Sequence, residues 1–172
     1  KRRPLVKTVR TQGRVTYDER KRSEIALKFP GFIGKIFVDF VGKPIEKNQP
    51  LFTIYSPELA VALEEYINLT QRTRTTQAPS ASLRLIKTAR QKLLLWDLTD
   101  KQIDEIVQIG EIPQYIPILS PASGIVVEKQ VVQGSPVMAG QILYRLANLS
   151  TVWIEASIYE SEFSLMRTGL PV

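Results

Sequence analysis

A short glycine-containing pattern occurs twice in this chain, over residues 31–52 and again over residues 124–144. The first copy reads GFIGKIFVDFVGKPIEKNQPLF. The second reads GIVVEKQVVQGSPVMAGQILY, with one residue fewer in the loop that precedes Gly134. An internal repeat restricts the possible folds strongly, because each copy is expected to form the same structural unit. Two copies are too few for a solenoid, so we expect the two units to pack against each other.

Each copy is too short to bury its own apolar residues, whereas two such units together can close a small β-sandwich. The aliphatic positions that the copies share therefore predict a joint core. Eight aliphatic side chains at about 1.5–3 kcal/mol each contribute on the order of 15 kcal/mol before the entropy cost of folding. The predicted repeat core consists of Ile33, Val38, Ile45, Leu51, Val126, Val131, Val137 and Leu143. Other matched pairs are Pro44 with Pro136, Gln49 with Gln141, and Phe52 with Tyr144.

Short β-strands are expected within and around the two copies. Residues 5–28 and 151–158 alternate between apolar and polar residues, which is the pattern of a half-buried strand. Turns are expected at 42–44 and 48–50, where prolines exclude a helix. We expect the N-terminal strand to pair with the strand at 151–158.

Between the two copies the apolar residues recur at helical spacing. Ser56 is a typical N-cap and Pro57 suits the first helical position, so a helix is expected from there to about residue 75. A polar connection leads to a second helix, which is expected to start near Ser82. Its predicted apolar face consists of Leu83, Ile86, Ala89 or Arg90, and Leu93.

A third, short helix is expected after the second. Thr99 and Gln102 match a capping box, and Gly110 is a typical C-terminal stop. Because the pairing of the two copies brings the ends of the insertion together, the helices must leave and return at one place. Two antiparallel helices of about 15–20 residues would project about 25–30 Å from that place.

The composition excludes several classes of protein. The chain has no cysteine and no histidine, which rules out a disulfide scaffold, thiolate metal sites and a histidine general base. No apolar run approaches the ~20 residues that span a bilayer. The adjacent Glu64 and Glu65 point to different sides of a helix, and no phosphate-binding glycine loop is present. We therefore predict no catalytic residues and no cofactor.

The charge is concentrated at the start of the chain. Residues 1–28 contain ten Lys and Arg against three acids, so the remainder is close to neutral. One interpretation is an anionic partner. The interpretation that we favour is a solvated strand pair, because the basic residues alternate with valines. Nucleic-acid binding is disfavoured, since Tyr17 and Phe29 are the only aromatic residues available there for stacking.

A metal site is also disfavoured. Thioethers suit Cu(I) and Ag(I). This chain has two methionines, Met138 and Met166, and we interpret both as gap-filling residues. We predict no metal ligands in this chain, while a methionine-bearing segment outside it stays possible.

The two half-motifs resemble those of biotinyl and lipoyl domains. Split by helices and flanked by strands, they are similar to the periplasmic adaptor, or membrane fusion, proteins of the HlyD-like superfamily. The segments GKIFVDFVGKPIEKNQPLFTIYSPEL and SPASGIVVEKQVVQGSPVMAGQILYRLANLSTVWIEASIYE resemble the heavy-metal-efflux, CusB-like branch in particular. The resemblance covers roughly residues 8–172.

The resemblance implies an α+β fold in three parts. A lipoyl-like sandwich is formed by the two half-motifs, a short α-helical hairpin or three-helix insertion interrupts it, and strands of a partial β-barrel flank it. The implied divisions are 1–29 with 148–172 for the barrel part, 30–55 with 116–147 for the sandwich, and 56–115 for the helices. Family members continue beyond these strands into a membrane-proximal domain, so we expect this chain to be part of a longer adaptor.

The resemblance also implies a function. Such adaptors lie in the periplasm of Gram-negative bacteria, associated with the inner membrane. They bridge an inner-membrane resistance-nodulation-division (RND) transporter and an outer-membrane channel, and they assemble into rings, with a hexamer as the expectation. The exported substrate would be a heavy-metal cation such as Cu/Ag or Co/Zn/Cd. The hairpin tip would contact the channel or a neighbouring adaptor through Arg72, Arg74, Gln77 and Ser80.

A biotinyl or lipoyl carrier domain is the alternative. Carriers present a modified lysine at a hairpin tip between their two halves. In this chain the corresponding junction is Tyr55-Ser56-Pro57-Glu58, which contains no lysine and is expected to start a helix. The carrier function is therefore disfavoured.

Overall fold

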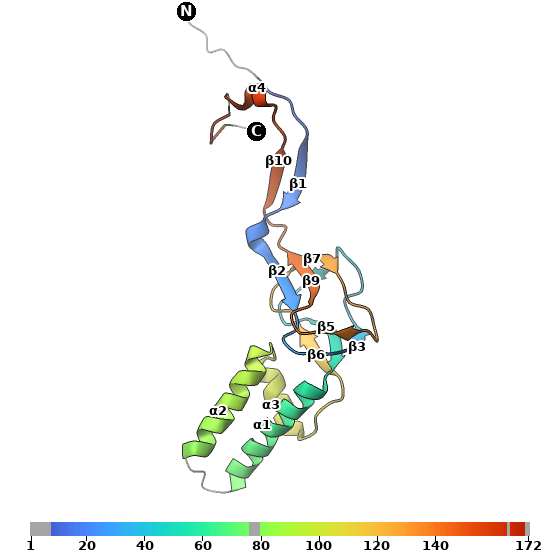
Figure 1. Ribbon diagram of the computed structural model, residues 1–172, viewed down its shortest axis with the longest axis vertical. Coiled ribbons are helices and arrows are strands. Elements are labelled where there is room, and N and C mark those ends of the chain that lie inside the picture. Colours follow the sequence, from blue (N-terminus) through green and yellow to red (C-terminus); the bar gives the residue numbers. More distant parts are fainter. Residues whose placement is uncertain (1–7, 76–79, 165, 171–172) are drawn as a thin grey trace, which may run out of the picture.

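The computed structural model describes residues 8–75, 80–164 and 166–170 and shows an elongated molecule (Figure 1). Two β-sheets lie in the middle. Three helices extend from one end of the sheets, and a two-stranded ribbon extends from the other. The chain is thus a mixed α+β protein with antiparallel sheets and a helical insertion, as predicted.

The two central sheets each contain four strands, and we call them together the sandwich. The first sheet has the order β2 (Arg22–Ala26), β9 (Ile142–Ala147), β7 (Gly124–Lys129) and β4 (Pro44–Ile45). The second has the order β6 (Ile116–Leu119), β5 (Pro50–Tyr55), β3 (Gly31–Ile36) and β8 (Pro136–Val137). The short strand β4 of the first copy pairs with β7 of the second, and β8 of the second copy pairs with β3 of the first. The copies therefore exchange their shortest strands, and neither sheet belongs to one copy alone.

The backbone hydrogen bonds of one copy recur in the other. The Gly42 amide donates to the Val126 carbonyl at 2.8 Å, and the Gly134 amide donates to the Ile33 carbonyl at the same distance. Both glycines have a positive φ, 94° and 80°, which favours glycine. The strands that precede the copies also correspond, because β2 leads into β3 as β6 leads into β7. The repeated unit therefore has four strands and is longer than the sequence pattern indicated.

The matched glutamines close the same turn in each copy. The Gln49 side-chain carbonyl accepts from the Glu46 amide at 3.0 Å, and the Gln141 side-chain carbonyl accepts from the Met138 amide at 3.1 Å. The turn in the first copy needs Asn48 at a φ of 67°. Asparagine tolerates this left-handed conformation better than most residues.

The core lies between the two sheets and continues into the helices. None of the eight predicted repeat-core residues is more than 3 % exposed, and all belong to one continuous cluster. The matched aromatic residues meet inside it, where the rings of Phe52 and Tyr144 stack with centroids 6.0 Å apart. The Tyr144 hydroxyl donates to the Val38 carbonyl at 2.7 Å, and burial raises the pKa of Tyr144.

The helical domain consists of α1 (Pro57–Thr75), α2 (Ser80–Leu95) and α3 (Asp100–Ile109). The predicted capping box of Thr99 and Gln102 is present, and Gly110 ends α3 with a φ of 75°. At the start of α1, the Ser56 hydroxyl accepts from the Leu59 amide at 3.2 Å. The predicted N-caps and the helix stop are therefore confirmed.

The prediction for the second helix was wrong in one detail. The helix α2 starts at Ser80, near the predicted Ser82, but Leu83 is 56 % exposed instead of lying on the packed face. In Figure 1, α3 lies beside the part of the hairpin nearest the sheets. The first turns of α2 consequently pack on one neighbouring helix instead of two, and only the later positions Ala89 and Leu93 are buried.

Arg90 connects all three helices. Its guanidinium donates to the Tyr66 hydroxyl of α1 at 2.9 Å and to carboxylate oxygens of Asp100 and Asp104 of α3 at 2.6 and 2.7 Å. The hydrogen bonds from Arg90 hold the pKa of Asp104 below its ordinary value and raise the pKa of Arg90 itself. Arg90 is therefore a polar link between helices. The sequence alone allowed it as an alternative to Ala89 on the apolar face of the second helix.

The ribbon consists of β1 (Gly13–Tyr17) and β10 (Val152–Ala156), with Val15 opposite Ile154. This confirms the predicted pairing of the N-terminal strand with 151–158. A one-turn 3₁₀ helix (Glu19–Lys21) and the short α4 (Glu160–Phe163) flank the ribbon. The predicted three-part division of the chain stays a prediction, although hydrogen bonds to β9 place β2 in the sandwich.

The equivalent glycines Gly31 and Gly124 provide a test of the packing. A Cβ at Gly31 would lie 2.6 Å from the Tyr55 carbonyl oxygen, whereas a Cβ at Gly124 would lie 3.0 Å from the Ala147 carbonyl oxygen. We expect Gly31→Ala to lower the free energy of unfolding by about 1–3 kcal/mol because backbone must move. Gly124→Ala serves as the matched variant and should lower the free energy of unfolding by less. Equal losses in chemical denaturation would contradict this crowding.

The Arg90 cluster predicts a pH-dependent contribution to stability. Because the pKa of Asp104 is lowered in the folded chain, its charge stabilises the fold above the ordinary value of 3.8. That contribution is lost as the pH falls through the lowered pKa. We expect Asp104→Asn to reduce Tm slightly at neutral pH, and this difference to disappear in acid. Glu111→Gln, an exposed control on the loop after α3, should show no such trend in thermal melts.

Candidate functional site

The candidate functional sites of this chain are parts of its surface. Across residues 8–75, 80–164 and 166–170, no three His, Cys, Asp or Glu side chains gather as a metal site would require. In the same residues, every buried side-chain nitrogen or oxygen has a hydrogen-bond partner. No described helix combines the length and the apolar character that crossing a membrane requires. The candidate sites are therefore the hairpin tip, the outer sheet faces and the ribbon.

The hairpin tip is the end of the helical domain that is farthest from the sheets (Figure 1). Of the four residues predicted to make contacts there, Arg72 lies in α1 with an exposed side chain. Arg74 and Ser80 lie at the ends of α1 and α2, where the structure describes the backbone without the side chains. Gln77 lies outside the described residues. The role of these four residues stays a prediction.

The junction between the two copies does not have the form of a carrier hairpin. The helix α1 begins at Pro57, directly after β5 and Ser56. Two lysines of the half-motifs make local contacts away from this junction. The ammonium group of Lys43 donates to the Phe37 carbonyl at 2.7 Å, and that of Lys129 donates to the Val131 carbonyl at 2.9 Å. The described geometry therefore offers no lysine at the position where a carrier is modified.

The outer face of the β2 sheet is charged. Arg145 on the central strand β9 pairs with Glu24 of β2 at 2.9 Å and with Glu128 of β7. Hydrogen bonds from Gln130 and from Arg145 hold the pKa of Glu128 below its usual value. These exposed ion pairs are worth little in stability and are typical of a solvated surface.

The outer face of the β6 sheet is aromatic instead. Phe32 on β3 is 49 % exposed and stands opposite Tyr55 and Pro136. Tyr115, 46 % exposed, lies over Gly34, where an added Cβ would be 2.6 Å from the ring, and its own ring lies 6.2 Å from that of Tyr55. Sequence analysis did not identify this surface. The two related sheets thus present different chemistry to the outside.

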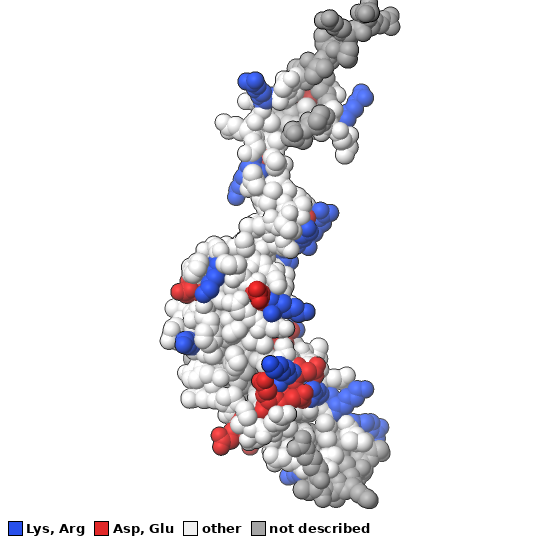
Figure 2. Space-filling view, turned by 180° about the vertical axis from the view of Figure 1, so that it is seen from behind, with Lys and Arg blue, Asp and Glu red and all other residues white. Residues whose placement is uncertain are grey.

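Several of the described basic residues near the N-terminus pair with carboxylates. Asp18 binds Arg20 at 3.0 Å, and Lys28 binds Asp97 at 2.9 Å. Figure 2 shows blue side chains scattered along the ribbon and the sandwich, and a mixed red and blue group over the helices. The paired and scattered charges fit the predicted solvated strand pair better than a site for an anionic partner.

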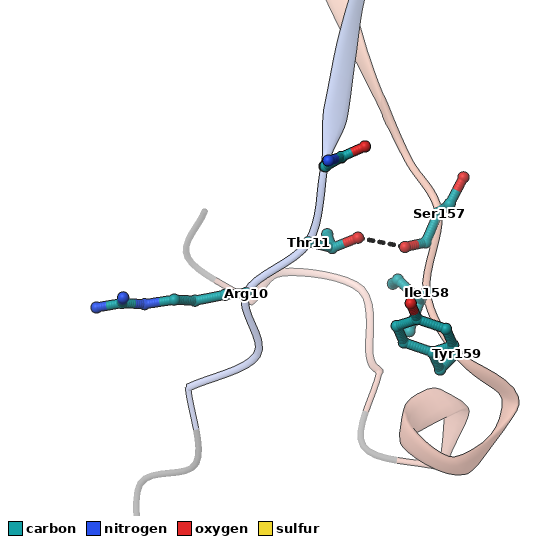
Figure 3. Close-up of a pocket in the computed structure, with 6 residues that line it drawn as sticks. Arg10, Thr11, Ser157, Ile158 and Tyr159 are labelled. Atoms are coloured by element: carbon teal, nitrogen blue, oxygen red, sulfur yellow. Dashed lines mark hydrogen bonds between the residues drawn. The ribbon is translucent and has the colours of Figure 1, made fainter.

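A hollow lies at the far end of the ribbon (Figure 3). The Thr11 hydroxyl donates to the Ser157 carbonyl there, and the side chain of Arg10 points away from them. Tyr159, which lines the hollow, is 78 % exposed. The other residues that line it are Gln12 and Ile158.

Comparisons with known proteins identify the family. The family model described as "CusB, barrel-sandwich hybrid domain" matches residues 23–147. Two proteins named cation efflux system protein CusB, from Escherichia coli O6:H1 strain CFT073 and from strain K12, are each 22% identical to this chain. Those alignments cover 92% and 86% of this chain but 37% and 34% of the relatives, so the chain spans about a third of their length.

The fold is shared with a solved structure. The crystal structure of ZneB from Cupriavidus metallidurans superposes with a TM-score of 0.56 at 19% identity, covering 90% of this chain and 72% of that one. At this identity the likeness shows the fold alone. The family match runs from the second residue of β2 to the end of β9 and includes the whole helical insertion. The chain therefore belongs to the CusB family of periplasmic adaptor, or membrane fusion, proteins and contains its barrel-sandwich hybrid domain.

Proposed function

We propose that this chain is part of the periplasmic adaptor of a tripartite efflux system, joining an inner-membrane RND transporter to an outer-membrane channel. The observation that supports this role is the shape of the chain: the helices and the ribbon leave the sandwich at opposite ends (Figure 1). A bridging protein needs two separated contact regions held by a fixed middle. The role is structural and non-enzymatic.

The parts have distinct tasks under this proposal. The sandwich is lipoyl-like and fixes the geometry. The ribbon is part of a β-barrel, whose inner face would include Val15 and Ile154, which are 65 % and 62 % exposed here. The helix α1 has 19 residues, so the helical domain reaches about 28 Å from the sandwich. Its tip contacts the channel or a neighbouring adaptor, within a ring for which we expect six copies.

The cargo that we propose is a heavy-metal cation, such as Cu/Ag or Co/Zn/Cd. The support is the name of the E. coli relatives, cation efflux system protein CusB. The location follows from the role: the periplasm of a Gram-negative bacterium, next to the inner membrane. To test the proposal, the adaptor gene would be deleted and restored, and growth measured separately in copper, silver, zinc, cobalt and cadmium. The proposed class of cargo would be contradicted if restoring the gene raised tolerance to none of these metals.

The hairpin tip can be tested in the same strain. We expect the double charge reversal Arg72→Glu with Arg74→Glu to reduce metal tolerance toward that of the deletion strain, because it changes the surface proposed to meet the channel. The matched control is Lys87→Glu with Lys101→Glu, which makes the same change in charge on the same domain away from the tip. Co-purification with the channel should fall for the tip variant alone. Equal tolerance in both variants would exclude this contact.

A further inference from the structure

The two ends of the sandwich are attached in different ways. Toward the helices, one continuous core crosses the boundary. It includes Phe29 from the loop after β2, Leu93 of α2, Leu98 after α2 and Ile103 of α3, each 3 % exposed or less. Packed cores of this kind resist continuous deformation. The helical domain and the sandwich therefore share buried surface as well as two chain connections.

The turn after α2 lies at the centre of this boundary. The Trp96 ring contacts the Phe29 ring with centroids 5.3 Å apart, and the Lys92 ammonium lies 4.9 Å from the centroid of the same indole ring. The next residue, Asp97, pairs with Lys28 of the sandwich at 2.9 Å. We call residues 96–98 the latch, because each of them contacts or shares a core with the sandwich.

Two further features mark the latch as a constrained element. Asp97 ends α2 in the left-handed conformation, with a φ of 65°, and the following Leu98 amide donates back to the Leu93 carbonyl at 3.3 Å, which turns the chain toward the sandwich. Just beyond the latch, the Gln102 side-chain amide donates to the Pro117 carbonyl of β6 at 2.8 Å. Contacts from the latch and from α3 thus reach both the β2 side and the β6 side of the sandwich.

The boundary with the ribbon has no comparable packing. Among the described residues, no member of the core cluster comes from 8–24 or 148–164. The Asn148 amide donates to the Lys21 carbonyl at 3.2 Å, Lys21 also pairs with Thr151, and the Arg20 guanidinium lies 5.5 Å from the Trp153 ring. These contacts are exposed or partly exposed, and the buried residue of this boundary is the polar Asp18, which Arg20 of the same turn binds at 3.0 Å. We call residues 18–21 and 148–151 the joint.

We infer that the latch makes the helical domain and the sandwich one rigid body, and that the chain bends at the joint. Local motion is expected where few apolar contacts are buried and backbone hydrogen bonds are exposed, which describes the joint and not the latch. This inference goes beyond the proposed function and does not rest on it, because it concerns this chain without transporter or channel.

The inference can be tested by distances between pairs of spin labels. The sequence has no cysteine, so introduced cysteines are the only labelling sites. Gln91 on α2, Gln133 in the sandwich and Gln12 before β1 are exposed positions. Double electron–electron resonance should give a narrow distance distribution for labels at 91 and 133, and a broad one for labels at 12 and 133. A broad distribution for the first pair would overturn the inference, as would a narrow one for the second.

Substitutions in the latch make the test specific. We expect Trp96→Ala to broaden the 91–133 distribution, because it removes the ring that Phe29 contacts. Trp153→Ala removes the other tryptophan, at the joint, and should leave that distribution narrow. If Trp96→Ala does not fold, Trp96→Leu retains apolar volume and should broaden the distribution less. A folded Trp96 variant with an unchanged narrow distribution would show that the latch does not hold the two parts together.

Discussion

The exchange of the two-residue strands β4 and β8 is the constraint on which the rest of the fold depends. Because β4 pairs with β7 and β8 with β3, while β2 pairs with β9 and β6 with β5, each sheet contains two strands from each four-stranded copy. Neither copy could therefore form its sheet alone. The pairing of β5 with β6, with Ile54 opposite Ile116, places the start of α1 beside the start of β6, so the helical insertion leaves and returns at one place.

Local signals predicted the parts of the fold that neighbouring residues determine. Thr99 and Gln102 form the expected capping box because both partners lie within one helical turn. The repeated aliphatic residues lie in the core because spacing alone distinguishes inward from outward positions. The exchange of β4 and β8 could not be predicted in this way, since two residues show no periodicity. Leu83 was misplaced because the extent of α3 beside the hairpin depends on tertiary packing.

The candidate surfaces were predicted less completely than the fold. The aromatic face joins Phe32, Tyr55 and Pro136 from three strands with Tyr115 from a connection, and only the strand order brings them together. Arg90 was ambiguous for a similar reason. Its spacing along the helix is compatible with a place on the apolar face. Its hydrogen-bond partners Tyr66, Asp100 and Asp104, however, lie on two other helices. Family resemblance supplied the role of the hairpin tip, which no pattern of residues indicates by itself.

The correspondence between the two copies has a consequence for how such chains change over time. The chain leaves β5 at Tyr55 to enter the helices and leaves β9 at Ala147 to enter the ribbon, and these two exits occupy equivalent places in the repeat. The sandwich thus has two equivalent attachment points, one at the end of β5 and one at the end of β9. The segment attached at either point could lengthen, shorten or be replaced without altering the strand registers of the sandwich. A single duplicated unit of four strands would be enough to generate a spacer whose reach is adjustable at each end independently.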